Sequence, residues 1–185
     1  MKHIGFLSFG HWTPSPQSQT RSAADALLQS IDLAVAIAVR LLNPSLAVIA
    51  RGRTPSVTAN MASFGTDHII NPFARFAEHL ALAVAAPERF RLIELLTALP
   101  ETPLPEPHRP PRGHWILCGY GRFGHFLADH LRPAGIELTI IDPECNPEQL
   151  ANSLNGHGTE AHTLRQAGIE RSTGIIAGSD NDVNN

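Results

Sequence analysis

The chain has 185 residues, of which 43% are hydrophobic and 17% charged, a balance that favours a folded protein over wholesale disorder. Its 14 Lys and Arg residues and 17 Asp and Glu residues give a net charge of −3, which excludes a basic footprint for nucleic acid or a membrane surface. The longest apolar run, 33–39, is far shorter than the about 20 residues that cross a bilayer. The two Cys residues suit a reduced cytoplasm, so we expect a cytoplasmic protein without direct membrane insertion.

Composition divides the chain into an N-terminal strand and loop, a helix and strand segment, a helical and Pro-rich linker, and a C-terminal segment, with the bounds 1–21, 22–72, 73–112 and 113–185. In the first part, 4–9 is typical of a strand. Apolar residues at helical spacing predict a helix over 22–42, ended by Asn43-Pro44. Strands are predicted at 46–50 and 68–70. The helix between them begins at Thr54-Pro55, an N-cap followed by Pro at the first helical position.

The third part is mostly helical over 73–99, with a break at Pro87. Two apolar stripes are predicted, one before and one after this break, and they consist of Phe73, Ala77, Leu80 and Val84, and of Phe90, Ile93, Leu96 and Leu99. Six of the twelve residues from Pro100 to Pro111 are proline, which predicts a stiff extended linker. A ligand for an SH3-type domain is the alternative interpretation of this stretch.

The fourth part alternates strands with short helices. Strands are predicted at 115–118, 136–141 and 173–177, with a weak one near 154–157. Helices are predicted from the end of the turn 119–124 to about Leu131, after Asn146-Pro147, and at 159–167. Such alternation favours a parallel sheet with right-handed crossovers, so the predicted fold class is α/β, a Rossmann-like doubly wound sheet.

A glycine-rich turn lies between the first strand and helix of this part. The motif G-x-G-x-x-G consists of Gly119, Tyr120, Gly121, Arg122, Phe123 and Gly124. In such a motif the first glycine permits a tight turn, the second lets backbone amides approach a pyrophosphate, and the third lets the helix pack on the strand. The helix N-terminus would then face the phosphates of a nucleotide.

Asp142 follows the next strand, 18 residues after Gly124, where an acid accepts hydrogen bonds from the adenosine ribose. This position favours NAD(H) or an adenine nucleotide, ATP or ADP, over NADP. Arg122 is placed to pair with a phosphate, with a neighbouring subunit's carboxylate, or with solvent. Asp180, just after the last strand, lies where loops of open α/β sheets contact ligands. The alternative interpretation of the glycine motif and Asp142 is a glycine-rich connector followed by a surface aspartate.

Other groups of reactive side chains give weaker patterns. His157, Glu160 and His162 lack the spacing of a zinc site, so no metal is predicted. Cys118 lies within a predicted strand and is typical of a buried apolar position. No acid–base pair is placed for hydride transfer, so no catalytic residue is predicted.

The C-terminal part resembles the first two-thirds of an RCK domain, the Trk-type regulator of potassium channels and transporters. The resemblance is carried by W-I-L-C-G-Y-G-R-F-G at 115–124, by L-T-I-I-D at 138–142 and by L-R-Q-A-G-I-E-R at 164–171. One departure is His157, which stands in G-H-G-T where the family usually has G-D-x-T.

Residues 34–73 resemble the last third of the same domain, through R-L-L-N-P-S-L-A-V-I-A-R and A-S-F-G-T-D-H-I-I-N-P-F. Residues 1–35 are similar instead to the opening strand and helix of luciferase-like flavin monooxygenases. The chain therefore resembles the end of one RCK domain joined to the beginning of another. Together the halves hold the elements of one doubly wound domain in permuted order. We expect them to pack into one sheet, within a chain or swapped between two chains.

The resemblance implies a non-catalytic regulatory module that binds NAD(H), or ATP or ADP, and acts as a homodimer or higher homo-oligomer. Its partner would be the pore subunit of a potassium channel or transporter, through which it would associate with the membrane. Two alternatives remain: a fragment of an NAD-dependent oxidoreductase, and a chimeric chain without a ligand.

Overall fold

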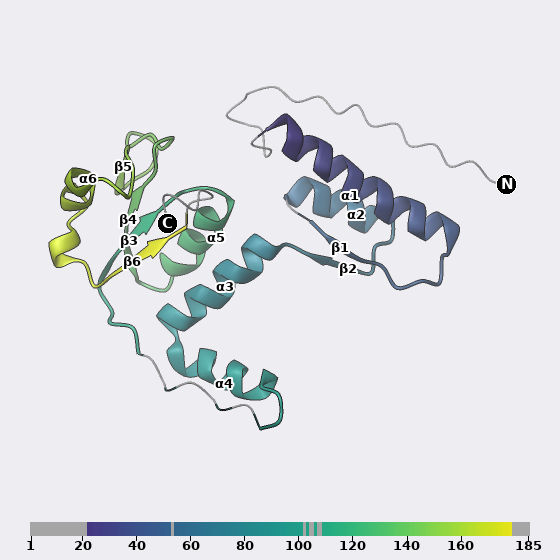
Figure 1. Ribbon diagram of the computed structural model, residues 1–185, viewed down its shortest axis with the longest axis horizontal. Helices are drawn as coiled ribbons and strands as arrows, with labels where there is room; N and C mark the ends of the chain where they lie inside the picture. Colours follow the sequence, from purple (N-terminus) through teal and green to yellow (C-terminus); the bar gives the residue numbers. More distant parts are fainter. Residues whose placement is uncertain (1–21, 53, 102, 104–105, 107–108, 179–185) are drawn as a thin grey trace. The chain divides into compact units, whose positions relative to one another are not determined.

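The computed structural model describes residues 22–52, 54–101, 103, 106 and 109–178 (Figure 1). The chain divides into two compact units, Met1–Pro72 and Phe73–Asn185, and each has its own sheet. The strand predicted at 4–9 and the loop after it lie outside the described residues.

The first unit is a strand–helix–strand element preceded by a long helix. Its elements are α1 (Ala23–Leu42), β1 (Ile49–Arg51), α2 (Pro55–Ser63) and β2 (His68–Ile70). The strands run parallel, with Ile49 opposite His68. The helix predicted over 22–42 and the strand predicted at 68–70 are confirmed. The strand predicted at 46–50 is displaced, because only Ile49–Arg51 pairs with β2.

The start of α2 follows the predicted capping chemistry. Thr54 is the N-cap in an extended conformation, and its side-chain oxygen accepts the N–H of Val57 at 3.4 Å. Pro55 occupies the first helical position, where its missing N–H costs no intrahelical bond. The local sequence is therefore sufficient to place this helix start.

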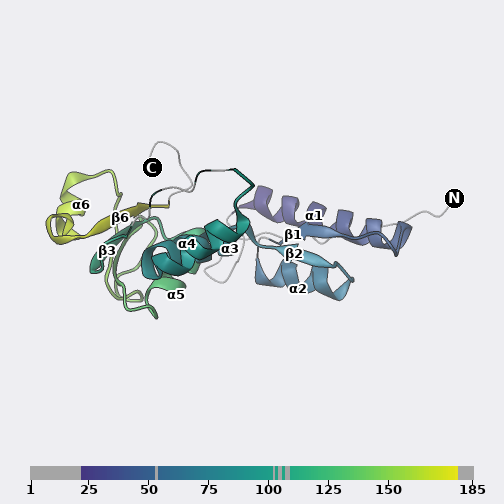
Figure 2. The ribbon, with the colours of Figure 1, turned by 90° about the horizontal axis from the view of Figure 1, so that it is seen from below.

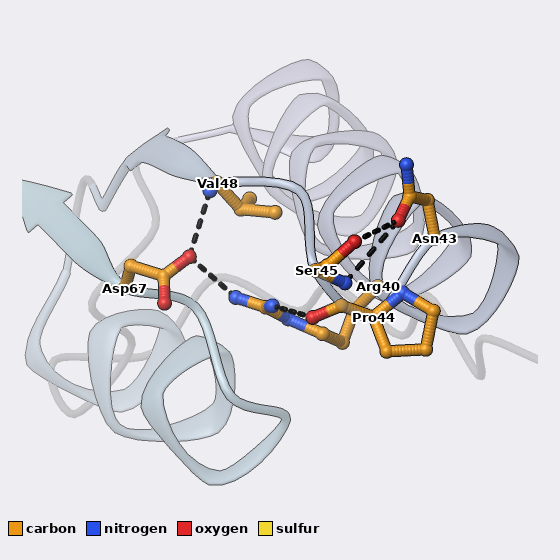
Figure 3. Close-up of polar contacts among 6 residues, drawn as sticks. All are labelled: Arg40, Asn43, Pro44, Ser45, Val48 and Asp67. Atoms are coloured by element: carbon orange, nitrogen blue, oxygen red, sulfur yellow. Dashed lines mark hydrogen bonds and ion pairs between the residues drawn. The ribbon is translucent and has the colours of Figure 1, made fainter.

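Asp67 links the end of α1 to the entry of both strands (Figure 3). Its Oδ2 accepts the N–H of Val48 at 2.8 Å and a guanidinium N–H of Arg40. The same guanidinium donates to the carbonyl of Pro44 at 2.6 Å. The N–H of Val48, and after it Arg40, holds the pKa of Asp67 below its ordinary value of 3.8. One carboxylate thus fixes the loop between α1 and β1.

The second unit is built on a four-stranded parallel sheet. Its strands β3 (His114–Cys118), β4 (Glu137–Ile141), β5 (Ser153–Leu154) and β6 (Gly174–Ala177) lie in the order β5-β4-β3-β6. β3 is central, with Trp115 opposite Leu138 on one side and Gly174 on the other. The predicted strands are confirmed, although the weak one expected near 154–157 is shorter and displaced to Ser153–Leu154. Such an order places the change in winding direction between β3 and β6.

Helices cover both faces of this sheet (Figures 1 and 2). Trp115 and Leu117 of β3 face α5 (Arg122–Leu131) and α3 (Pro72–Ala85), whereas Ile116 and Cys118 face α6 (Ala161–Gln166) and the 3-10 turn after it. The predicted doubly wound architecture is therefore confirmed. The side chains buried on the first face include Ala77, Ala81, Val84, Leu127, Leu131, Leu138 and Ile140.

Helix α3 belongs to this folded unit, although the composition placed it in the linker. Its Ala77, Ala81 and Val84 are buried in the core under β3. The break predicted at Pro87 is confirmed, since α4 (Pro87–Thr97) starts there. By contrast, none of the side chains of α4 is buried. Small residues on α3 let it approach the sheet closely.

One sequence prediction is wrong. The brief helix expected after Asn146 is only a turn, in which the Asn146 carbonyl accepts the N–H of Gln149 and of Leu150. Among the described residues, the four strands of the second unit pair with one another, and so do β1 and β2. The packing of both halves into one sheet, within a chain or swapped between two chains, stays a prediction.

The two-stranded sheet leaves much of the apolar stripe of α1 uncovered. Leu27 and Val35, which belong to the apolar residues at helical spacing, are 61% and 57% exposed. A sheet of two short strands offers too little surface to cover a helix of 20 residues.

Within the part of the chain that the structure describes, no helix combines the length and the apolar character needed to cross a membrane.

We expect Asp67→Asn to lower the melting temperature of the first unit at neutral pH, because the amide keeps the shape but loses the charge. The folded pKa is lowered, so the carboxylate stabilises the fold above its unfolded pKa and this stability is lost as the pH falls through the folded value. The melting difference between wild type and variant, followed by circular dichroism, should shrink below about pH 4. Glu78→Gln, in an exposed pair with Arg75, is the matched control and should change little. Equal effects of the two variants at neutral pH would contradict this role of Asp67.

Candidate functional site

The turn after β3 requires a glycine at its first position. Gly119 has a φ of +98°, a left-handed conformation that side-chain-bearing residues rarely adopt. Its N–H donates to the carbonyl of Ile141 at 2.8 Å, which ties the end of β3 to the end of β4. The chain can therefore leave the sheet and reverse into α5 within a few residues.

The third glycine of the motif allows α5 to begin directly against this turn. A Cβ added at Gly124 would lie 2.2 Å from the carbonyl oxygen of Gly119, closer than any side chain tolerates. Gly121 is the N-cap, with extended backbone, and the N–H of His125 makes a helical bond to its carbonyl. The amides of the first turn precede that bond, and together with the helix dipole they attract an anion.

Asp142 lies one residue beyond β4 and reaches the glycine turn. Its Oδ2 accepts the N–H of Tyr120 at 2.6 Å, and its Oδ1 accepts the N–H of Glu144 at 2.8 Å. The carboxylate is thus fixed by two backbone amides, and each oxygen keeps a further acceptor site. The sequence predicts the neighbourhood of Asp142 and the turn but not this backbone role.

Tyr120 and Phe123 contribute to the site through backbone and packing. The Tyr120 ring lies on the imidazole of His125, with centroids 3.8 Å apart, and burial raises the pKa of its phenol. The Phe123 ring packs on Phe76 at 5.2 Å and against the core. Direct contact of either side chain with a ligand stays a prediction.

The pairing of β6 with β3 continues up to the start of the glycine turn. The N–H of Gly178 donates to the carbonyl of Cys118 at 2.8 Å, and a Cβ at Gly178 would lie 2.9 Å from the Phe123 ring. Only backbone therefore fits between β6 and the glycine turn at this point. The predicted site residue Asp180 lies outside the described residues.

Arg122, the first residue of α5, has its guanidinium carbon 4.6 Å from the centroid of the Phe73 ring. Phe73 is the second residue of α3, and both side chains are half-buried. The sequence singles out Arg122 but gives no sign of its aromatic neighbour, which is 49 positions away.

A third loop, 156–159, reaches the carboxyl end of β3. A Cβ at Gly158 would lie 2.6 Å from Sγ of Cys118, so this backbone rests directly on the buried thiol. Burial raises the pKa of Cys118, which keeps the thiol protonated. Glu160 accepts the N–H of His157 at 3.3 Å and the hydroxyl of Thr163 at 2.9 Å, and these bonds lower its pKa. In the sequence, this loop is marked by His157, which stands where the RCK family usually has an aspartate.

Among the described residues, no three His, Cys, Asp or Glu side chains are grouped so that they could hold a metal ion.

Comparison with known proteins gives three kinds of match. The family model of the TrkA-N domain matches residues 115–185. Potassium channel protein 1 of Methanocaldococcus jannaschii is 33% identical over 79 residues, which cover 39% of this chain and 24% of that protein. An uncharacterized protein of Methanothermus fervidus is 32% identical over 83 residues, covering 40% of this chain and 13% of that protein. The chain therefore spans at most 24% of the length of these two relatives.

Among solved structures, the crystal structure of GsuK bound to ADP has a TM-score of 0.57 at 22% identity, over 84% of this chain and 35% of that chain. The GsuK channel bound to NAD has a TM-score of 0.57 at 17% identity, over 84% of this chain and 40% of that chain. The crystal structure of the GsuK RCK domain has a TM-score of 0.55 at 17% identity, over 85% of this chain and 49% of that chain. At these identities the likeness shows the fold alone. Since it covers 84% of the chain, it extends to residues before Trp115.

We expect Gly124→Ala to destabilise the second unit by about 1–3 kcal/mol, because its Cβ must push α5 away from Gly119. The displaced turn should lose the bond from Tyr120 to Asp142, so the Tyr120 amide should exchange its hydrogen faster. Gly135→Ala is the control: φ there is +78° but no atom lies within 4 Å of an added Cβ. It should cost about 1–2 kcal/mol and leave the Tyr120 amide protected. Protection retained in both variants would refute the close-approach role of Gly124.

Proposed function

We propose that this chain is a nucleotide-binding regulatory module of a potassium channel or transporter, since its residues 115–185 match the family model of the TrkA-N domain. The ligand is NAD(H) or an adenine nucleotide, ADP or ATP, bound at the glycine turn. The observation that carries this proposal is the backbone of Gly119–Gly124 opening onto the α5 N-terminus, with Asp142 held beside it.

The first turn of α5 supplies the phosphate-binding element. Its amides and the positive end of the helix dipole attract a diphosphate, and the absence of a Cβ at Gly121 lets oxygen atoms approach the backbone. Arg122 at the first helical position adds a positive charge on the same turn. The likeness in fold to GsuK structures bound to ADP and to NAD supports a ligand of this class.

Asp142 supplies the ribose-binding element. Its oxygens are oriented by the N–H groups of Tyr120 and Glu144 and keep lone pairs for the ribose hydroxyls. A ribose 2′-phosphate would meet this negative charge, so NAD(H) is favoured over NADP. The carboxylate is already fixed before a ligand arrives, which reduces the ordering cost of binding.

The module acts by shifting a conformational equilibrium rather than by chemistry. A nucleotide that binds one arrangement of a homodimer more tightly than another moves the population toward it, and the pore subunit follows. The relative named potassium channel protein 1 supports a channel as the partner, although this chain spans 24% of its length. The protonated Cys118 thiol against Gly158 is not prepared for nucleophilic attack, which supports a non-catalytic role.

Asp142→Ala tests the ribose contact, but it also removes two backbone hydrogen bonds. Calorimetry therefore measures the affinity of wild type and of the variant for two ligands, ADP and ADP that lacks both hydroxyls of its ribose. Wild type should prefer ADP by about tenfold or more, because hydrogen bonds to a charged group contribute about 1.5–3 kcal/mol. The variant should bind the two ligands equally.

Wild type that binds both ligands with equal affinity would exclude the ribose role of Asp142. Wild type that binds neither ADP nor NAD would exclude the proposed function.

Incubation of the protein with NADH and a panel of small aldehydes and ketones distinguishes a regulatory module from an oxidoreductase. We expect the NADH absorbance to stay constant while calorimetry shows that NADH is bound. Steady loss of NADH that depends on both protein and carbonyl compound would favour the oxidoreductase.

A further inference from the structure

The arginine of the glycine turn is held by an aromatic ring from a different helix. The guanidinium of Arg122 lies over the face of Phe73, 4.6 Å from the ring centroid. Phe73 opens α3, and α3 is anchored one turn further on by the buried side chain of Ala77. The ring is therefore fixed by the core of the same unit that carries the glycine turn.

An aromatic ring and an anion contact different parts of a guanidinium. The ring stacks on its flat face, whereas its N–H groups donate within its plane. A phosphate bound at the edge of an arginine is therefore compatible with a ring on its face. In addition, side chains in an α-helix lean toward its N-terminus, so Arg122 leans toward the glycine turn.

We infer that Phe73 is a positioning residue for the proposed nucleotide site, since it holds the Arg122 guanidinium at the phosphate end of α5. The inference rests on the proposed function and adds a residue that the glycine motif does not contain. An arginine side chain loses many rotamers when it pairs with a phosphate, and stacking on Phe73 removes part of this freedom beforehand. Phe73 acts only through Arg122, so its effect must depend on the phosphates of the ligand.

The chain offers a matched control on the same helix. Phe76 lies three positions after Phe73 and packs on the Phe123 ring rather than on Arg122. Replacement of either phenylalanine by leucine removes one aromatic face from α3. Only Phe73→Leu removes the face beneath the guanidinium.

The experiment measures the affinity of wild type and variants for ADP and for adenosine by calorimetry, with thermal unfolding of each variant beside it. Phe73→Leu should lower the affinity for ADP about three- to tenfold and leave the affinity for adenosine unchanged. Phe73→Tyr and Phe76→Leu should both bind ADP with the affinity of wild type. In an Arg122→Ala background, Phe73→Leu should cause no further loss. Phe73→Met replaces Phe73→Leu if the leucine variant does not fold.

Equal loss in the Phe73 and Phe76 variants would overturn the inference, and so would an additive loss in the Arg122→Ala background. A parallel loss of adenosine affinity would do the same, because adenosine carries no phosphate. These outcomes leave the proposed function in place, since wild type still binds ADP. Wild type that binds no nucleotide overturns the proposed function, and the role of Phe73 with it.

Discussion

The approach of Gly124 to the carbonyl of Gly119 is the constraint on which the second unit depends. At 2.2 Å from an added Cβ, that oxygen allows no side chain, so α5 begins directly on the turn that ends β3. The buried residues Leu127 and Leu131 can then lie on the face of Leu117, and the helix N-terminus opens at the edge of the sheet. Packing of the core and access to the first-turn amides have one geometric cause.

Carboxylates that accept backbone amides organise the loops of both units. Asp67, before β2, accepts the N–H of Val48 near the start of β1, and Asp142, after β4, accepts the N–H of Tyr120 after β3. Each bond joins neighbouring parallel strands beyond the end of their ladder, where the backbone groups have lost their partners in the sheet. In the second unit the same bond fixes a carboxylate beside the glycine turn, and this is the carboxylate to which the proposed function assigns the ribose.

Local chemistry made much of this fold predictable. Thr54-Pro55 predicts a helix start because capping involves only neighbouring residues. The number of residues between Gly124 and Asp142 in the sequence predicts that both lie at one edge of the sheet. The contacts of Phe73 with Arg122 and of Gly158 with Cys118 were not predictable, since they join segments far apart in the chain. The packing of both halves into one sheet stays a prediction, since it too depends on segments far apart in the chain.

The covalent path into the site has a consequence for substitutions outside it. β2 ends at Ile70, α3 begins at Pro72, and the next residue is the ring beneath the Arg122 guanidinium. Two peptide bonds therefore connect Asn71, the residue after β2, to the residue whose ring contacts the Arg122 guanidinium. A substitution at either Asn71 or Pro72 is thus covalently adjacent to that contact, although neither residue belongs to the glycine motif.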